Sequence, residues 1–254
     1  RRLMLQVDHL TLKFGGLIAN NDVSMRVQEG KITGLIGPNG AGKTTFFNSI
    51  SGVYKPTSGT ITFLGKRIDG LQPYQINQMG MSRTYQVINL FKKMSVVENV
   101  MVGMHPHMKQ GYFASAFKTA GERREERECY ERAYELLDFV GLKGRAFEQA
   151  GSLSYGQQRH LEIVRGLASN PKLILLDEPA AGMNSKEKEE LNELLYRIID
   201  RGVSILIIEH DMKLMMGVAD YLYVLNYGKL LAEGTTSEIQ TNPEVIKAYL
   251  GGDE

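Results

Sequence analysis

The N-terminal part of the chain shows the alternation of apolar and polar residues that is typical of β-strands. Residues 3–14 alternate along their length, with Leu10, Leu12 and Phe14 on one face. A turn at Gly15-Gly16 follows this predicted strand. Further extended segments are predicted over residues 22–27 and 31–36, and then a helix over 43–51 and a hairpin over 59–68.

The middle of the chain changes to a helical pattern. Residues 91–165 are mainly of this kind, and residues 122–137 are rich in Glu, Arg, Ala and Leu. Residues 105–121 are predicted to be a connecting insertion. We therefore expect residues from about 90 to 165 to form a helical subdomain inserted into the rest of the chain.

Strands and helices alternate again in the C-terminal part. Apolar runs predict strands over 173–176 and 203–208, a helix over 185–201, a hairpin over 221–233 and a short helix over 243–250. This order is typical of an α/β fold with a parallel sheet. We expect one domain over residues 1–254, in which residues 1–89 and 166–254 form the α/β core with an antiparallel β subdomain.

The composition is that of an ordinary globular protein. Apolar residues make up 43% and charged residues 23% of the chain, so disorder is excluded as the dominant state. The net charge of +1 argues against a protein whose main partner is nucleic acid. Cys129 is the only cysteine, which excludes an internal disulfide and a multi-cysteine zinc site. No apolar run is long enough to span a bilayer, and Arg1–Met4 open no signal-peptide pattern.

The strongest chemical signal is a glycine-rich loop between a predicted strand and a predicted helix. Residues 37–44 match the pattern G-x-x-x-x-G-K-[ST], in which backbone N–H groups surround the phosphates of a nucleotide. Lys43 would add a positive charge beside the β- and γ-phosphates, and the Thr44 hydroxyl would bind Mg²⁺. The predicted nucleotide-binding residues here are Gly37, Pro38, Asn39, Gly40, Ala41, Gly42, Lys43, Thr44 and Thr45.

Two acids follow the apolar run at 173–176. In a protein with a phosphate-binding loop, Asp177 can bind Mg²⁺, and Glu178 can act as a general base toward water. The alternative is a buried strand that ends in two solvated acids. Ser154 precedes a helical run predicted over 158–167 and would cap it, leaving N–H groups for an anion. On spacing alone, a simple helix cap with a turn glycine is the favoured explanation.

Taken in order along the chain, these motifs resemble the complete set of an ATP-binding-cassette (ABC) ATPase. Leu153–Gln157 resembles the family signature L-S-G-G-Q, with Tyr155 in place of a glycine. The resemblance implies that Ser154, Gly156 and Gln157 bind the nucleotide held by the opposite subunit of an ATP-sandwiched dimer. It implies that Gln86 contacts Mg²⁺ and the water, and that His210 contacts the γ-phosphate. It also implies the P-loop fold of that family.

Two further positions depend on this resemblance. Phe14 lies where the family has an aromatic residue that stacks on adenine, whereas its alternation with Leu10 and Leu12 favours a core position. Asn184 stands where the family has an aspartate.

Several segments are similar to the ATPases of branched-chain amino acid importers, namely residues 83–86, 154–158, 178–184, 208–213 and 245–250. The resemblance implies an ATPase with ATP and Mg²⁺ that powers uptake, lying peripherally on the cytoplasmic face of the inner membrane. Its implied partners are a second, non-identical ATPase subunit, two membrane permeases and, indirectly, a solute-binding protein, with no nucleic acid. Urea or lipopolysaccharide transport, and a soluble ABC ATPase outside transport, are the alternatives.

Overall fold

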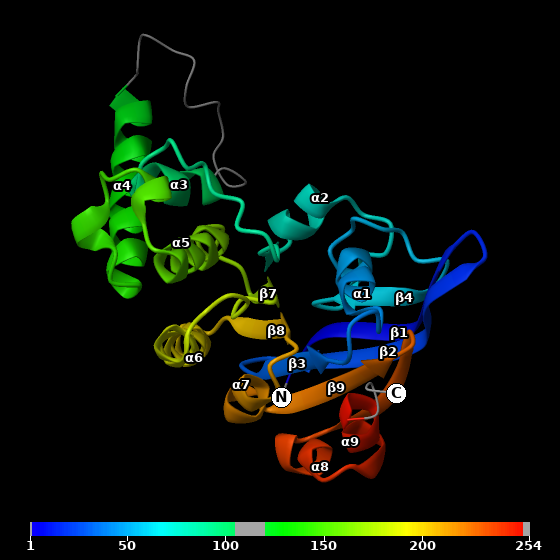
Figure 1. The fold of residues 1–254 in the computed structure, drawn as a ribbon. Helices are drawn as coiled ribbons and strands as arrows, with labels where there is room; N and C mark the ends of the chain where they lie inside the picture. Colours follow the sequence, from blue (N-terminus) through cyan, green and yellow to red (C-terminus); the bar gives the residue numbers. More distant parts are fainter. Residues whose placement is uncertain (1, 105–119, 251–254) are drawn as a thin grey trace.

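Two β-sheets form the centre of the molecule (Figure 1). The computed structural model describes residues 2–104 and 120–250. The smaller sheet has the strand order β2-β1-β4-β5 and is antiparallel. Its strands are β1 (Leu3–Phe14), β2 (Leu17–Gln28), β4 (Ser58–Phe63) and β5 (Lys66–Arg67).

The larger sheet has the order β10-β9-β3-β8-β7-β6 and is parallel except for β10, which pairs antiparallel with β9. All residues of the three central strands are buried, because helices or the smaller sheet cover both faces. The strands are β3 (Ile32–Ile36), β6 (Met81–Arg83), β7 (Leu173–Asp177), β8 (Ser204–Ile208), β9 (Tyr221–Asn226) and β10 (Lys229–Gly234).

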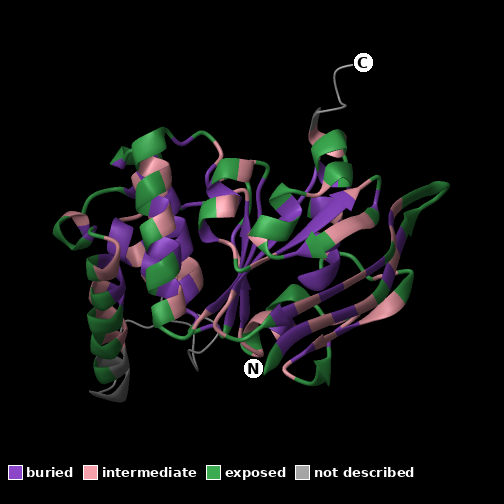
Figure 2. Ribbon diagram, turned by 90° about the horizontal axis from the view of Figure 1, so that it is seen from below, coloured by how far each residue is buried: buried purple, intermediate pink, exposed green. Residues whose placement is uncertain are grey.

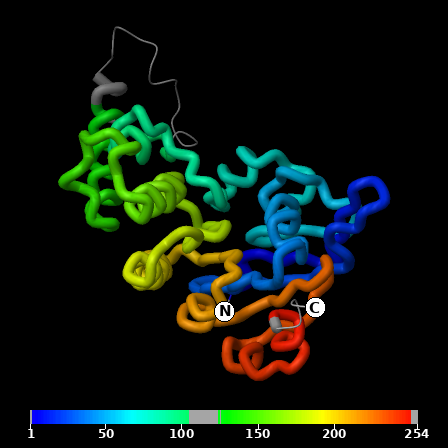
Figure 3. Tube along the Cα trace, in the orientation of Figure 1, coloured from blue at the N-terminus to red at the C-terminus, as the bar shows by residue number. Residues whose placement is uncertain are grey.

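The helices fall into two groups. One group lies with the sheets: α1 (Lys43–Ile50), α2 (Pro73–Gln78), α6 (Ser185–Asp200), α7 (Met212–Val218), α8 (Thr236–Gln240) and α9 (Pro243–Leu250). The other group forms a helical part at one end of the molecule, which Figure 3 shows in green. It comprises α3 (Val96–Gly103), α4 (Ala120–Phe139), α5 (Tyr155–Leu167) and the short 3₁₀ helices η2 (Lys143–Arg145) and η3 (Ala150–Ser152).

The apolar core has two layers that share the large sheet. In β7, Ile174 and Leu176 face a cluster that continues into α3, α4, α5 and α6, whereas Leu173 and Leu175 face a cluster shared with α1 and β1. This division follows from the two-residue period of a strand. Figure 2 shows the buried segments meeting along the central strands. The helical part therefore shares a continuous apolar core with the sheet.

The structure confirms most of the predicted elements within a few residues and corrects others. The second extended segment begins at Leu17 rather than at residue 22, and the helix predicted over 158–167 begins at Tyr155. The segments α2, β6, α7 and α8 were not predicted. The predicted insertion at 105–121 lies almost wholly outside the described residues. Among the described residues, no helix is both long and apolar enough to cross a membrane.

The alternative of a core position for Phe14 is wrong. Leu10 and Leu12 are buried, but Phe14 is 44% exposed. The pairing of β1 with β2 shifts register between Leu10 and Leu12, and again between Leu12 and Lys13. These irregularities insert extra residues into β2, so the alternation along β1 itself is kept. Leu17, the pairing partner of Phe14, and Ile18 are 66% and 45% exposed, so the end of the hairpin lies outside the core.

Candidate functional site

The glycine-rich loop connects the end of β3 to the start of α1, as its sequence predicts. Two of its glycines are required by close neighbours. A Cβ atom on Gly37 would lie 2.2 Å from the Leu225 carbonyl oxygen, and one on Gly42 would lie 2.6 Å from that of Ala19. Gly42 also has a φ of 95°, which disfavours other residues. The loop is thus held between β9 and β2, with its backbone fixed at both ends.

Lys43 is folded back into this loop. Its side chain is only 6% exposed, and Nζ donates to the carbonyl oxygens of Gly37 and Pro38 at 2.6 and 3.0 Å. Burial lowers the pKa of Lys43, while Glu178 and Asp177 oppose this change. Helix α1 begins at Lys43, and its N-cap residue is Gly42. Because glycine has no side chain, no cap residue accepts a hydrogen bond from the first N–H groups of the helix. A cation and free amide donors therefore meet at one place, which suits a phosphate group.

Asp177 ends β7 and is 2% exposed. Its Oδ2 accepts a hydrogen bond from Arg83 Nη2 at 2.8 Å. Its Oδ1 is buried and has no hydrogen-bond partner among the described residues. A buried carboxylate oxygen without a donor is suited to a hard divalent cation. Arg83 was missed by the sequence reasoning, because only the parallel pairing of β6 with β7 brings it to Asp177.

Glu178 is the point where three separate chain segments meet. Gln86 Nε2 donates to Glu178 Oε2 at 2.8 Å, and His210 Nδ1 lies 3.7 Å from the same oxygen. The Glu178 side chain is 14% exposed, and its backbone has a φ of 47°. Its N–H donates to the Ile208 carbonyl oxygen at 3.0 Å, which fixes it to the end of β8. The three predicted catalytic side chains are thus brought together around one carboxylate.

Glu209 holds the backbone beside Glu178 and His210 in place, and the sequence patterns did not identify it. It is fully buried, and its carboxylate accepts hydrogen bonds from the N–H groups of Ala180 and His210 at 2.7 and 3.3 Å. Burial raises the pKa of Glu209. It therefore connects the loop that follows Glu178 to the backbone of His210.

Ser154 caps α5 as predicted. Its Oγ accepts from the Gln157 N–H at 3.3 Å, and Gln157 Oε1 accepts from the Ser154 N–H at 3.1 Å and from Arg145 Nη1 at 2.7 Å. These residues lie in the helical part, whereas the glycine-rich loop lies beside α1 in the other part of the molecule (Figure 1). The chain therefore presents the two predicted nucleotide-binding motifs in different places.

Two aromatic rings lie at the end of the β1–β2 hairpin. Phe14 and Tyr54 are 44% and 37% exposed, and their ring centroids are 5.2 Å apart in an edge-to-face arrangement. Phe14 is therefore free to receive a planar group on its exposed side. No pattern in the sequence pointed to Tyr54.

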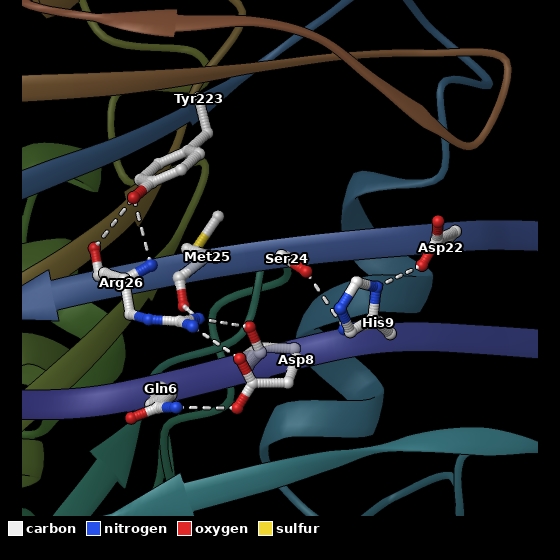
Figure 4. A network of polar contacts seen from close by, with 9 residues as sticks. Gln6, Asp8, His9, Asp22, Ser24, Met25, Arg26 and Tyr223 are labelled. Carbon is white, nitrogen blue, oxygen red and sulfur yellow. Dashed lines mark hydrogen bonds and ion pairs between the residues drawn. The ribbon is translucent and has the colours of Figure 1, made fainter.

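A polar network between the two sheets lies outside this site (Figure 4). Tyr223 Oη accepts from the Arg26 N–H at 3.0 Å and donates to the Arg26 carbonyl oxygen at 3.2 Å, and burial raises the pKa of Tyr223 to about 12. The Arg26 side chain also pairs with Asp8, and His9 Nδ1 lies 2.7 Å from Asp22. The network joins β1, β2 and β9, and so positions the strand that contacts Gly37.

Comparison with known proteins gives a consistent result. A family described as ABC transporter matches residues 20–181, and one described as branched-chain amino acid ATP-binding cassette transporter matches residues 229–254. The high-affinity branched-chain amino acid transport ATP-binding protein LivG of Salmonella typhimurium is 49% identical over 98% of both chains. BraF of Pseudomonas aeruginosa, described in the same words, is 47% identical over 98% of both chains.

Solved structures agree with these sequence matches. The ADP conformation of MJ1267, an ATP-binding cassette of an ABC transporter, is 31% identical with a TM-score of 0.88, covering 99% of this chain and 100% of that one. The dimeric structure of MJ0796, a bacterial ABC transporter cassette, is 26% identical with a TM-score of 0.75, covering 92% of this chain and 99% of that one.

Proposed function

This chain belongs to the ABC transporter family of ATP-binding proteins, and from that premise we propose that it is the ATP-hydrolysing motor subunit of an importer for branched-chain amino acids. It does not bind the amino acid itself. The choice of solute is supported by the two relatives described as branched-chain amino acid transport proteins and by the C-terminal match over residues 229–254.

The observation that carries the proposed chemistry is the meeting of Gln86, Glu178 and His210 beside the glycine-rich loop. Glu178 accepts the proton of the attacking water as general base, and the Gln86 amide holds that carboxylate in place. We assign to the His210 imidazole, which is 55% exposed beside Glu178, a contact with the terminal phosphate of the bound nucleotide. The products are ADP, phosphate and the proton taken up by Glu178.

Binding of the nucleotide is assigned to the loop and its surroundings. Lys43 exchanges its two carbonyl partners for phosphate oxygens, and Phe14 stacks on the adenine. The residues that fit a magnesium ion are Asp177, with its unpartnered Oδ1, and the side chains of Thr44 and Gln86. When bound, such an ion neutralises charge on the phosphate oxygens.

The complete site needs a second ATPase subunit. Ser154, Gly156 and Gln157 lie on the helical part, and we assign them to the nucleotide of a partner cassette, a pairing supported by the dimeric relative. We further propose that this partner is a non-identical subunit. Residues 90–165 then act as the helical subdomain of this cassette, and closure of the two subunits on ATP drives the transporter.

The membrane partners are two permeases, and we place the chain on the cytoplasmic face of the inner membrane. Val87 and Phe91 follow Gln86 in sequence and are 78% and 51% exposed. Exposed apolar side chains beside a catalytic residue are suited to a contact with another protein, and such a contact is sensitive to the state of the catalytic site. We therefore place the permease contact at residues 87–94.

The test reconstitutes the chain with its partner ATPase, the permeases and the solute-binding protein in vesicles. We expect ATP-dependent uptake of labelled leucine, no uptake with Glu178→Gln, and a mixed ATPase dimer that Glu178→Gln holds closed with ATP and that opens with ADP. Uptake of urea but not leucine would overturn the assigned solute. Full ATPase activity from a strictly monomeric preparation would overturn the composite site.

A further inference from the structure

Arg159 is the largest completely buried side chain of the described residues, and the mechanism above does not use it. It lies in α5, one helical turn after Tyr155 of the signature segment. Its guanidinium donates from Nη1 to the Tyr85 carbonyl oxygen at 2.9 Å and from Nη2 to the Gln86 carbonyl oxygen at 2.8 Å. One planar group therefore holds two successive carbonyls of the segment that carries Gln86.

The same arginine forms a buried ion pair with Glu162. Nη1 lies 2.6 Å from Glu162 Oε2, and the two side chains are 0% and 1% exposed. Glu162 Oε1 in turn accepts from the Asn89 N–H at 3.3 Å. The pair thus holds residues 85–89 against α5 from both ends of the segment.

Stability alone is a poor explanation for this pair. Taking two charges out of water costs several kcal/mol, and apolar residues of similar volume are often as good or better. The Nε of Arg159 is also buried without a hydrogen-bond partner among the described residues. What the guanidinium offers, and an apolar side chain does not, is a fixed fork of donors that orients two carbonyls at once.

The two ends of this connection lie at different functional places. At one end, the side chain of Gln86 donates to Glu178 at 2.8 Å. At the other end, the Tyr155 hydroxyl lies 3.5 Å from Arg159 Nη2, and Tyr155 follows the helix cap Ser154. The Tyr155 ring also packs on the loop after Glu178, because a Cβ on Gly182 would lie 3.3 Å from its Cε1.

We propose that Arg159 is a positioning residue that sets Gln86 according to the position of α5. This chain presents the turn at Ser154 to the nucleotide of the partner. Arg159 connects that turn to hydrolysis at Glu178 of the same chain. A displacement of α5 moves the two carbonyls, and so moves the Gln86 amide relative to the carboxylate. This inference rests on the proposed function, because it needs Glu178 as the base and Ser154 at the partner's site.

The test is a double-mutant cycle on ATP hydrolysis by the reconstituted transporter. The pair is replaced by Arg159→Met/Glu162→Gln, which removes both charges of the buried pair together and keeps an acceptor for the Asn89 N–H. We expect kcat to fall about tenfold with KM for ATP within about twofold of wild type, since misplacement of a catalytic group by an ångström costs up to about 10²-fold. In a Gln86→Ala background the same pair of changes should lower kcat by less than about twofold, because residues that act through one another are not additive.

Arg197→Met is the matched control. Arg197 also joins the helical part to the core, since its guanidinium lies 4.4 Å from the ring centroid of Phe139 in α4. Within the described part of the chain, no hydrogen bond or ion pair connects it to the segment that carries Gln86. We expect its kcat to stay within about twofold of wild type, and any effect to add fully to that of Gln86→Ala. Arg159→Lys, which keeps a cation facing Glu162 without the planar fork, covers the case that the double variant fails to fold, and it should lower kcat in the same non-additive way.

Three results are decisive against the inference. An unchanged kcat in both the Arg159→Met/Glu162→Gln and Arg159→Lys variants would overturn it. So would a loss that adds fully to Gln86→Ala, because that is the behaviour of a merely structural pair. If wild-type transporter hydrolyses no ATP, or Glu178→Gln hydrolyses it at the wild-type rate, the proposed function fails first and the inference fails with it.

Discussion

Replacing Lys43 by methionine separates nucleotide binding from folding. Lys43 is 6% exposed, and among the described residues it donates to the carbonyl oxygens of Gly37 and Pro38. Methionine keeps most of the packed volume. It loses these two bonds but also removes a buried charge, so we expect the free energy of unfolding without nucleotide to change by about 1 kcal/mol or less. With nucleotide, the variant loses a charge-assisted contact worth about 1.5–3 kcal/mol, which weakens Kd about 10- to 150-fold.

Thermal unfolding with and without MgATP measures both quantities. At a nucleotide concentration 100 times the wild-type Kd, binding stabilises the wild type by about 2.7 kcal/mol, whereas a variant with 100-fold weaker binding gains about 0.4 kcal/mol. Lys31→Met is the control, because Lys31 pairs with Asp220 away from the glycine-rich loop and should leave the nucleotide effect intact. A Lys43→Met variant that MgATP stabilises as strongly as wild type would refute the assignment of the phosphate site.

Three further changes test other parts of the site. Glu178→Gln should still bind MgATP but turn over at least about 10²-fold more slowly in the reconstituted transporter, and an undiminished rate would place the base elsewhere. Gly42→Ala should lower the free energy of unfolding by about 1–3 kcal/mol in denaturant unfolding, because φ is 95° and the new Cβ would lie 2.6 Å from the Ala19 carbonyl oxygen. Gly144→Ala is the matched control, because a Cβ at Gly144 meets no described atom within 4 Å. Burial raises the pKa of Glu209 in the folded state. The contribution of this shift to the free energy of unfolding is therefore complete below the ordinary glutamate pKa of 4.5, and it is lost as the pH rises through the raised pKa. The melting temperature of Glu209→Gln should therefore rise relative to that of wild type as the pH is raised above 4.5, and a constant difference would contradict this titration.

The sequence predicted best those elements whose pattern is local. The central strands β7 and β8 are continuous apolar runs because both faces are buried, and the glycine-rich loop is a contiguous motif. By contrast, β6 has only three residues, Met81–Arg83, and owes its existence to pairing with β7. No sequence period can reveal a strand of that length.

The same distinction holds within the site. The predicted residues belong to contiguous sequence motifs. Arg83 and Glu209, by contrast, join the site through tertiary contacts. Arg83 reaches Asp177 across 94 positions of sequence, and Glu209 bonds to the Ala180 N–H across 29. Neither residue stands out by its neighbours in sequence, so only the folded chain identifies them.

The parallel pairing of β6 with β7 has a consequence for the order of folding. Met81–Arg83 align with Leu173–Leu175, so roughly 90 residues of chain must return to the sheet before these three pairs can form, at an entropic cost of about 4 kcal/mol for a flexible loop. Three residue pairs cannot offset that cost alone. We therefore expect the helical part to collapse on its shared apolar core first, which shortens the loop, and β6 to dock last. Its amide hydrogens should accordingly exchange with solvent through the earliest opening of the large sheet, and since Arg83 leaves with β6, that opening releases Asp177 before the rest of the sheet unfolds.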